Sequence, residues 1–306
     1  MPDTRDFAIL VPSFNSTGTV DATLRSIQQQ SGGLNRIAQV VLSDDASADD
    51  TVNVARACWT SDVPLRIRRQ GRRTGECGNV NGAFAELPET VRWVLILHSD
   101  DMARPEWLRV MLRAADGASS NVASITASWD VLLPDGRLVP GEQRDPTESA
   151  LVHGNQEWIQ RWVIEGCWWK ITSCCIRRDV FLATGGLDSS FRQMYDVEFI
   201  LRVLRAGYDV LYVPASLSIY RVHDRSVTAN SFRRNWDLID NFLIFCEFMT
   251  YLDKAHKQRG YYLQARNAAH RVLDSVKRRQ FRRAASAVRL GANIGGSYLR
   301  YLLPRA

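Results

Sequence analysis

Long apolar runs are missing from this sequence of 306 residues. A helix that crosses a membrane needs about 20 consecutive, mostly apolar residues, whereas the longest stretches here, such as residues 93–97, are far shorter. The N-terminus also lacks the basic, apolar and small-residue regions of a secretory signal peptide. These absences predict a protein that has no transmembrane helix and stays in the cytoplasm.

Familiar cysteine and glycine patterns are absent as well. The six cysteines form no C-x-x-C pair and do not follow metal-ligand spacing, so neither a zinc ribbon nor a secreted disulfide framework is indicated. Residues 12–18, after the first predicted strand, hold one glycine and no basic residue. This argues against the phosphate loop of a nucleotidyltransferase and against the G-x-G-x-x-G turn of a nicotinamide-dependent oxidoreductase.

Charge is distributed unevenly along the chain. The composition, 45% apolar and 24% charged, is that of a folded soluble domain. Residues 256–306 carry twelve Lys and Arg against one acidic residue, a net charge of +11, which leaves −5 for the rest because the whole chain carries +6. The positive charge of residues 256–306 suggests an anionic partner for this tail. The negative charge of residues 1–255 argues against nucleic-acid binding by that part of the chain.

Strand-like apolar segments alternate with helical patterns in the first hundred residues, and a further strand-like region lies at residues 119–139. Such alternation predicts a mostly parallel sheet with helices on both faces. Ser47 is expected to cap a helix that runs to residue 57. The predicted strands of the first part cover residues 7–11, 38–42, 65–68 and 93–97.

Polar residues follow three of these strands. Ligands bind beyond the carboxyl ends of the strands in such sheets, so these residues are expected in one cleft. Adjacent carboxylates such as Asp100 and Asp101 can bind Mg²⁺ or Mn²⁺, which in turn can hold a diphosphate. Asp44 and Asp45 can accept hydrogen bonds from a base or a ribose. Either pair alone could serve a turn or a helix N-terminus, but two pairs at one edge favour function.

Six segments resemble, in the expected order, motifs of the family 2 glycosyltransferases with the GT-A fold. The resemblance covers about residues 7–228 and implies an α/β fold, with a mostly parallel mixed sheet and helices on both faces. It implies a catalytic domain at residues 1–230, followed by a helical, basic extension at 231–306. The six segments are residues 7–15, 43–51, 75–81, 98–101, 185–199 and 220–223.

The resemblance also implies roles for single residues. Mn²⁺ or Mg²⁺ would be held by Asp101, Asp100 and His223, with Asp101 the better candidate for direct ligation, since His98 replaces the first acid of the motif. Donor contacts are implied for Pro12, Phe14, Asn15, Asp44, Asp45, Gly75, Asn81 and Asp100.

The resemblance implies that Asp196 is the catalytic base, because Tyr195-Asp196 stands where the family often has an acidic pair. A rival base, Glu198, lies two residues further on and would point to another side of a helix. Arg202, four residues later, offers Glu198 an ordinary ion pair, so we expect a structural role for Glu198.

The predicted function is metal-dependent, inverting transfer of a sugar from a UDP- or dTDP-sugar to an acceptor hydroxyl, in polysaccharide or glycolipid assembly. Attack by a hydroxyl on the anomeric carbon needs a base for the proton and a Lewis acid for the leaving diphosphate. The alternatives are a nucleotidyltransferase and a non-catalytic nucleotide-sugar-binding protein. The acceptor is expected to be a saccharide or a lipid-linked molecule.

The basic tail predicts a peripheral contact with a membrane surface. Leu273, Val276 and Phe281 lie close in sequence to clustered Lys and Arg, and such a segment can place its apolar side in the interface. A solvated helical face or an oligomer contact is the alternative. Nucleic-acid binding is not expected, since the tail lacks a recognised reading motif.

Overall fold

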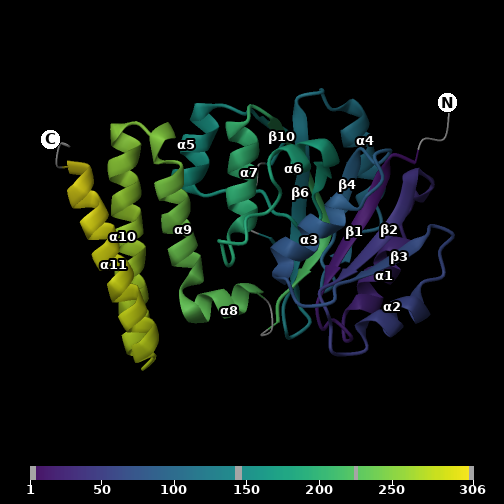
Figure 1. Cartoon of the computed structure of the whole chain (residues 1–306), viewed down its shortest axis with the longest axis horizontal. Coiled ribbons are helices and arrows are strands. Elements are labelled where there is room, and N and C mark those ends of the chain that lie inside the picture. Colours follow the sequence, from purple (N-terminus) through teal and green to yellow (C-terminus); the bar gives the residue numbers. More distant parts are fainter. Residues whose placement is uncertain (1–4, 142–146, 224–226, 303–306) are drawn as a thin grey trace. The chain divides into compact units, whose positions relative to one another are not determined.

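The computed structural model describes residues 5–141, 147–223 and 227–302 and divides the chain into two compact units (Figure 1). Unit 1 comprises Met1–Gly154, Trp168–Ser189 and Arg202–His223. Unit 2 comprises Asn155–Cys167, Ser190–Leu201 and Asp224–Ala306. The division predicted at residue 230 stays a prediction.

Unit 1 is built on one mixed sheet. Its first four strands are all parallel and lie in the order β3-β2-β1-β4, which then continues as β9-β6-β10-β5. Strands β6 and β10 are parallel to each other, whereas β9 and β5 run antiparallel to their neighbours. The bounds are β1 Phe7–Ser13, β2 Ile37–Asp44, β3 Leu65–Arg69, β4 Trp93–Ile96, β5 Met102–Ala103, β6 Val122–Leu132, β7 Leu138–Pro140, β8 Ala150–Val152, β9 Cys175–Arg177 and β10 Asp209–Arg221.

Helices cover both faces of this sheet. Alternate residues of β1, such as Ile9, share a buried apolar cluster with Leu24 and Trp107 from helices on one face. On the other face, the Phe84 ring stacks on Phe181 at 3.7 Å between centroids. This confirms the predicted fold class. The first face carries α1 Val20–Gln28, α2 Thr51–Cys58 and α4 Trp107–Gly117, and the second α3 Gly75–Ala85 and α6 Arg178–Ala183.

The start of α2 differs from the expected one. The helix begins at Thr51, not just after Ser47. The Ser47 hydroxyl instead donates to the Asp44 carboxylate and accepts a hydrogen bond from the Asn15 N–H. Ser47 therefore links two loops, and the prediction that it caps the helix was wrong.

The sheet reverses its winding direction at β1. From β1 the chain proceeds to β2 and β3 on one side, and β4 then pairs with β1 on the other side. Such a switch point opens a crevice beyond the carboxyl ends of the strands. The loops that follow β1, β2 and β4 meet at this edge.

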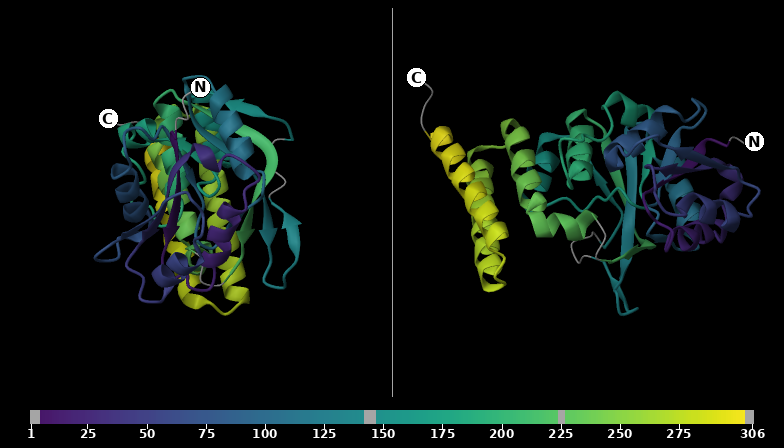
Figure 2. Two further views of the ribbon diagram at one scale, coloured as in Figure 1. Left: turned by 90° about the vertical axis from the view of Figure 1, so that its right-hand side faces the viewer. Right: turned by 60° about the horizontal axis from the view of Figure 1, so that its bottom comes forward.

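Unit 2 is helical, and its apolar core is formed by residues such as Phe242, Phe245, Tyr261 and Leu290. Figure 2 shows its last two helices side by side as an antiparallel pair. None of the described helices combines the length and the apolar character needed to cross a membrane. The helices are α5 Gln156–Glu165, α8 Val227–Arg234, α9 Trp236–Glu247, α10 Lys254–Lys277 and α11 Phe281–Leu302, together with the first part of α7 Tyr195–Arg205.

Gly186 should tolerate no side chain. It adopts a left-handed φ of 67°, and a Cβ there would lie 2.5 Å from the Asn81 Oδ1 atom. We expect Gly186→Ala to lower the free energy of unfolding by about 1–3 kcal/mol, the cost of strain in this region. Gly71→Ala is the matched control, because a Cβ at Gly71 meets nothing within 4 Å. Equal melting temperatures for the two variants would contradict this account.

Candidate functional site

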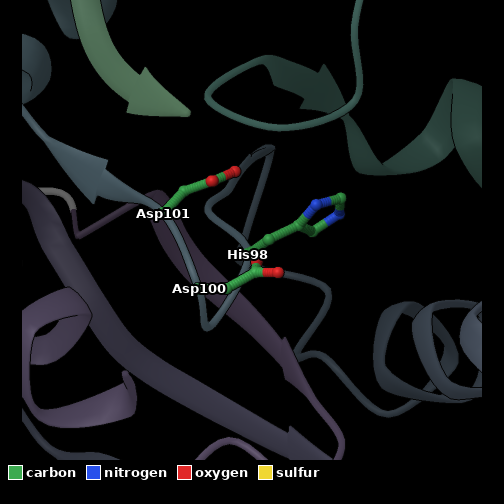
Figure 3. A group of neighbouring side chains, drawn as sticks. All are labelled: His98, Asp100 and Asp101. Carbon is green, nitrogen blue, oxygen red and sulfur yellow. The ribbon is translucent and has the colours of Figure 1, made fainter. Parts of the chain in front are cut away.

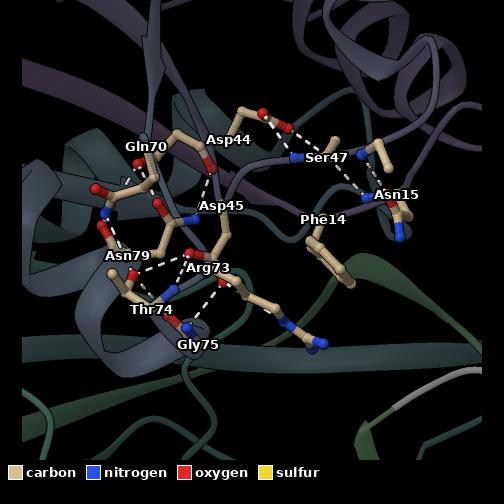
Figure 4. A network of polar contacts seen from close by, with 12 residues as sticks. Phe14, Asn15, Asp44, Asp45, Ser47, Gln70, Arg73, Thr74, Gly75 and Asn79 are labelled. Carbon is tan, nitrogen blue, oxygen red and sulfur yellow. Dashed lines mark hydrogen bonds and ion pairs between the residues drawn. The ribbon is translucent and has the colours of Figure 1, made fainter.

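The loops after β1 and β2 are fastened to each other. The Asn15 N–H donates to the Ser47 hydroxyl at 2.8 Å, and the Asn15 Oδ1 atom accepts from the Ala48 N–H at 2.9 Å (Figure 4). The Ser16 N–H donates to the Thr51 hydroxyl at 2.7 Å. Asn15, a predicted donor contact, thus also holds the loop in shape, and it adopts a left-handed φ of 51°.

Both acids of the second strand's loop are buried and hydrogen-bonded within the chain. Asp44 accepts from the N–H and the hydroxyl of Ser47. Asp45 accepts from the Thr74 N–H at 2.7 Å, the Thr74 hydroxyl at 2.9 Å and the Gly75 N–H at 2.8 Å. Asp45 therefore joins the end of β2 to the start of α3. Oδ1 of Asp45 accepts both hydrogen bonds from Thr74, whereas Oδ2 accepts the one from Gly75.

Arg73 lies beside the predicted donor contacts, although the sequence reasoning did not include it. Its guanidinium lies 3.9 Å from the centroid of the Phe14 ring, and the side chain is largely exposed (Figure 4). The signal for it was the basic pair at residues 72–73, just before Gly75. Arg73 places a positive charge where an anionic ligand could reach it.

The remaining predicted donor contacts differ in accessibility. Pro12 is buried in the sheet, and its carbonyl accepts from the Ser99 N–H at 3.3 Å. Gly75 has a left-handed φ of 76° and open space where a side chain would be. Asn81 is tied to the backbone of Leu187 by two hydrogen bonds of 2.8 Å, one through each end of its amide. Asn81 thus joins α3 to the segment that precedes α7.

Three side chains gather after β4. His98, Asp100 and Asp101 each offer one ligand atom, and these atoms lie within 4.8 Å of one another (Figure 3). His223, which follows β10, joins them, with its Nε2 atom 2.9 Å from Asp100 Oδ2. The structure therefore places the predicted ligands Asp100 and Asp101 together with His98, and it places His223 beside Asp100.

The two neighbouring acids have different surroundings. The Asp101 residue is 1% exposed, and its oxygens accept from the Arg221 N–H at 3.0 Å and the Thr172 hydroxyl at 2.8 Å. The side chains of Asp100 and His223 are each 32% exposed. Asp101 thus fastens the loop to β10, whereas Asp100 and His223 remain open to a ligand.

Glu76 of α3 pairs with His98 in this cluster. His98 Nε2 lies 2.9 Å from Glu76 Oε1. Burial alone would lower the pKa of His98, but Glu76, and more weakly Asp101 and Asp100, raise it to about 10. Burial and the Asp100 charge raise the pKa of Asp101 to about 7, against the influence of His98.

The donor set fits a divalent cation. Carboxylate oxygens are the preferred ligands of Mg²⁺ and Mn²⁺, and imidazole nitrogen is a common ligand of transition metals. Asp100 and His223 present such atoms with their side chains partly open to solvent. A cation here would also relieve the repulsion between the two acids that raises the pKa of Asp101.

Asp196 lies in unit 2, in the first turn of α7. It is partly buried, and its Oδ1 atom accepts from the Val197 N–H at 2.8 Å. Glu198 is buried. The loop before α7 is held by buried Asp240 of α9, whose Oδ2 atom accepts three backbone N–H groups, those of residues 192, 193 and 194, at 2.7–3.1 Å. Asp240 was not predicted; its signal is an acid within the apolar sequence of α9.

The sequence is similar to that of a known protein family. Residues 8–140 match the sequence model of the family described as glycosyl transferase family 2. The succinoglycan biosynthesis protein ExoO of Rhizobium meliloti (strain 1021) is 33% identical over 132 residues, which cover 43% of this chain and 35% of ExoO. The match therefore spans about a third of the length of that relative.

Two solved structures resemble the whole fold. S. aureus TarS 1-349 in complex with UDP-GlcNAc has a TM-score of 0.61 at 15% identity, covering 98% of this chain and 93% of the other. The mannosyltransferase PcManGT from Pyrobaculum calidifontis, in complex with GDP-Man and Mn²⁺, has a TM-score of 0.59 at 15% identity, covering 93% and 84%. At such identities the likeness concerns the fold, which is of the predicted GT-A type.

Replacing His98 should change how stability depends on pH in the metal-free chain. The raised pKa means that the protonated ring favours folding, fully below its ordinary pKa of 6.5, and that this contribution is lost as pH rises through about 10. The corresponding Asp101 contribution is lost earlier, between 3.8 and about 7. In EDTA, we expect the melting temperature to fall more steeply above pH 6.5 for the wild type than for His98→Gln. Parallel profiles would contradict the ion pair with Glu76.

Proposed function

We propose that this chain, in which residues 8–140 form a family 2 glycosyltransferase domain, transfers a sugar from a nucleotide-sugar to an acceptor hydroxyl with the help of a divalent cation. The observation that carries the proposal is the pairing of Asp100 with His223, 2.9 Å apart and partly exposed, at the switch-point edge of the sheet. A carboxylate and an imidazole at this edge suit a cation that holds a diphosphate.

The donor is proposed to lie along the loops after β1, β2 and β3. Phe14 and Asn15 border this region from β1, and Arg73 supplies a cation over the Phe14 ring. The donors in the two related structures differ in their bases, uracil in UDP-GlcNAc and guanine in GDP-Man. The fold alone therefore does not determine the nucleobase of the donor. On the sequence motifs, we favour a UDP- or dTDP-sugar.

Direct metal ligation is assigned to Asp100 and His223 in place of the earlier preference for Asp101. Their side chains are each 32% exposed, whereas Asp101 is 1% exposed and its oxygens hold the Arg221 N–H and the Thr172 hydroxyl. Asp101 keeps the loop after β4 against the end of β10, which positions His223. When bound, Mn²⁺ or Mg²⁺ supplies positive charge for the leaving diphosphate.

Asp196 is proposed as the base, because residues 185–199 resemble the segment of the family 2 glycosyltransferases that carries the base. Its carboxylate takes the proton of the acceptor hydroxyl as that oxygen bonds to the anomeric carbon and the bond to the diphosphate breaks, which inverts the configuration. Asp240 is a positioning residue, because its hydrogen bonds fix the backbone just before α7.

The acceptor is proposed to be a saccharide or a lipid-linked molecule. ExoO is a succinoglycan biosynthesis protein, which supports a place in polysaccharide assembly for this chain. We assign catalysis to residues 1–230 and regard 231–306 as an extension.

The metal assignment predicts that substitutions of Asp100 and Asp101 differ in their effects on activity and stability. Asp100→Asn should keep the wild-type melting temperature in EDTA and reduce transfer to the level of the EDTA-treated wild type. Asp101→Asn should also lose about 1–3 kcal/mol of stability, because Asn has one acceptor oxygen in place of the two that accept from Arg221 and Thr172. Activity is measured with and without Mn²⁺. Near-normal transfer by the wild type in EDTA, or by the Asp100→Asn variant with Mn²⁺, would contradict the assignment.

The base assignment predicts a loss of turnover without a loss of binding. Asp196→Asn should lower turnover by about 10²-fold or more, the scale of a positioned general base. Its donor-induced rise in melting temperature should match that of the wild type. Glu157→Gln is the control, an exposed acid in the first turn of α5 in the same unit. If Glu198→Gln loses turnover and Asp196→Asn does not, the base is Glu198.

A further inference from the structure

Helix α11 carries an apolar stripe along its outer face. Phe281, Val288, Leu299 and Leu302 are 52–68% exposed. Spacings of seven, eleven and three residues place them on one side of a helix. The positions between them on this side, residues 285, 292 and 295, are exposed Ala, Ala and Gly. The stripe therefore runs the length of α11 without a polar residue.

The other sides of α11 have distinct roles. Ala287, Leu290 and Ile294 are buried, and the last two belong to the apolar core of unit 2. Next to the stripe stand Arg282, Arg289 and Arg300, all exposed, and α11 contains no acidic residue. The helix thus has one inner face, one outer apolar stripe and one basic flank.

Helix α10 adds apolar side chains to the outside of the pair. Gly260 faces Phe245 of α9, and the Tyr261 hydroxyl meets Ser297 of α11 at 2.9 Å. Tyr262 comes a further 100° around the helix and is exposed, as are Leu273 and Val276 on the same side. Both helices therefore present apolar residues to solvent.

A basic hollow lies at the turn between α10 and α11. It has a volume of about 450 Å³ and contains the exposed ring of Phe281 in its wall. Asp274, the one acid of residues 256–306, pairs with Arg278 at 2.7 Å and with Arg283, which lines the hollow, at 3.7 Å. The hollow is also at the N-terminus of α11, where the helix dipole favours anions. Its lining is Arg233, Arg279, Gln280, Phe281, Arg282 and Arg283.

We propose that α11 rests on an anionic membrane surface. The stripe enters the boundary between headgroups and acyl chains, the flanking arginines reach lipid phosphates, and the hollow takes a phosphate headgroup beside Phe281. A second copy of the chain is not expected to cover this face. If two α11 helices packed face to face, their arginines would lie close together and repel each other, because α11 has no acidic residue to pair with them. This inference does not depend on the proposed transferase activity.

The test is sedimentation of the full chain with vesicles of phosphatidylcholine alone, or of phosphatidylcholine mixed with phosphatidylglycerol. We expect binding to the mixed vesicles only, and loss of that binding in high salt. Each arginine near anionic lipid contributes roughly a fivefold gain in partitioning. Arg282→Glu with Arg289→Glu should therefore weaken binding by about 25-fold or more.

The apolar stripe is tested by Val288→Asp with Leu299→Asp, which should weaken binding about tenfold or more. Matched controls lie in unit 1: Arg109→Glu with Arg113→Glu on exposed positions of α4, and Leu182→Asp on α6. Both controls should bind as the wild type does. Circular dichroism checks that each variant keeps its helices. If the variant with Val288→Asp and Leu299→Asp does not fold, the proposal is judged on the variant with Arg282→Glu and Arg289→Glu.

Three results would overturn the proposal. The first is a wild-type chain that stays in solution with mixed vesicles in low salt. The second is an arginine variant that binds as tightly as its α4 control. The third is a chain that is dimeric in sedimentation velocity without lipid and becomes monomeric with Val288→Asp and Leu299→Asp, which would assign the stripe to a second copy.

Discussion

Parallel pairing of β1 with β2 on one side and β4 on the other is the constraint on which the rest of the site depends. It carries three chain segments, far apart in sequence, to one edge of the sheet. Hydrogen bonds then hold the loops together, including the contact of 2.7 Å between the hydroxyls of Ser16 and Ser99. This edge lies at the switch point of the sheet, where ligands bind in folds of this kind.

Buried acids do most of the positioning in this molecule. Asp45 and Asp240 each accept three hydrogen bonds from loop residues, and Asp101 joins the ends of β4 and β10. Burying a carboxylate is costly unless such donors compensate it. The groups left accessible are few, chiefly Asp100, His223 and Arg73. The structure thus separates acids that shape the site from groups that can meet a ligand.

The sheet could be predicted because β1, β2 and β4 are continuous apolar runs with polar residues after them. Helix α3 was not predicted, since its apolar residues form no stripe. The motifs pointed to Asp100 and Asp101, but not to their different burial. That difference depends on Thr172 and Arg221, which lie 71 and 120 residues from Asp101. The ties of Asn81 to Leu187 and of Asp240 to the segment before α7 span 106 and 46–48 residues, and they have no local signal.

The central claim is that this edge binds a nucleotide diphosphate through a cation held by Asp100 and His223. Calorimetric titration of UDP into the chain tests it most directly, with the wild type and Asp100→Asn compared in Mn²⁺ and in EDTA. The account predicts that Mn²⁺ tightens UDP binding strongly for the wild type and hardly at all for Asp100→Asn. Equal binding of UDP by the wild type in Mn²⁺ and EDTA, or an unchanged Mn²⁺ effect in Asp100→Asn, would contradict it.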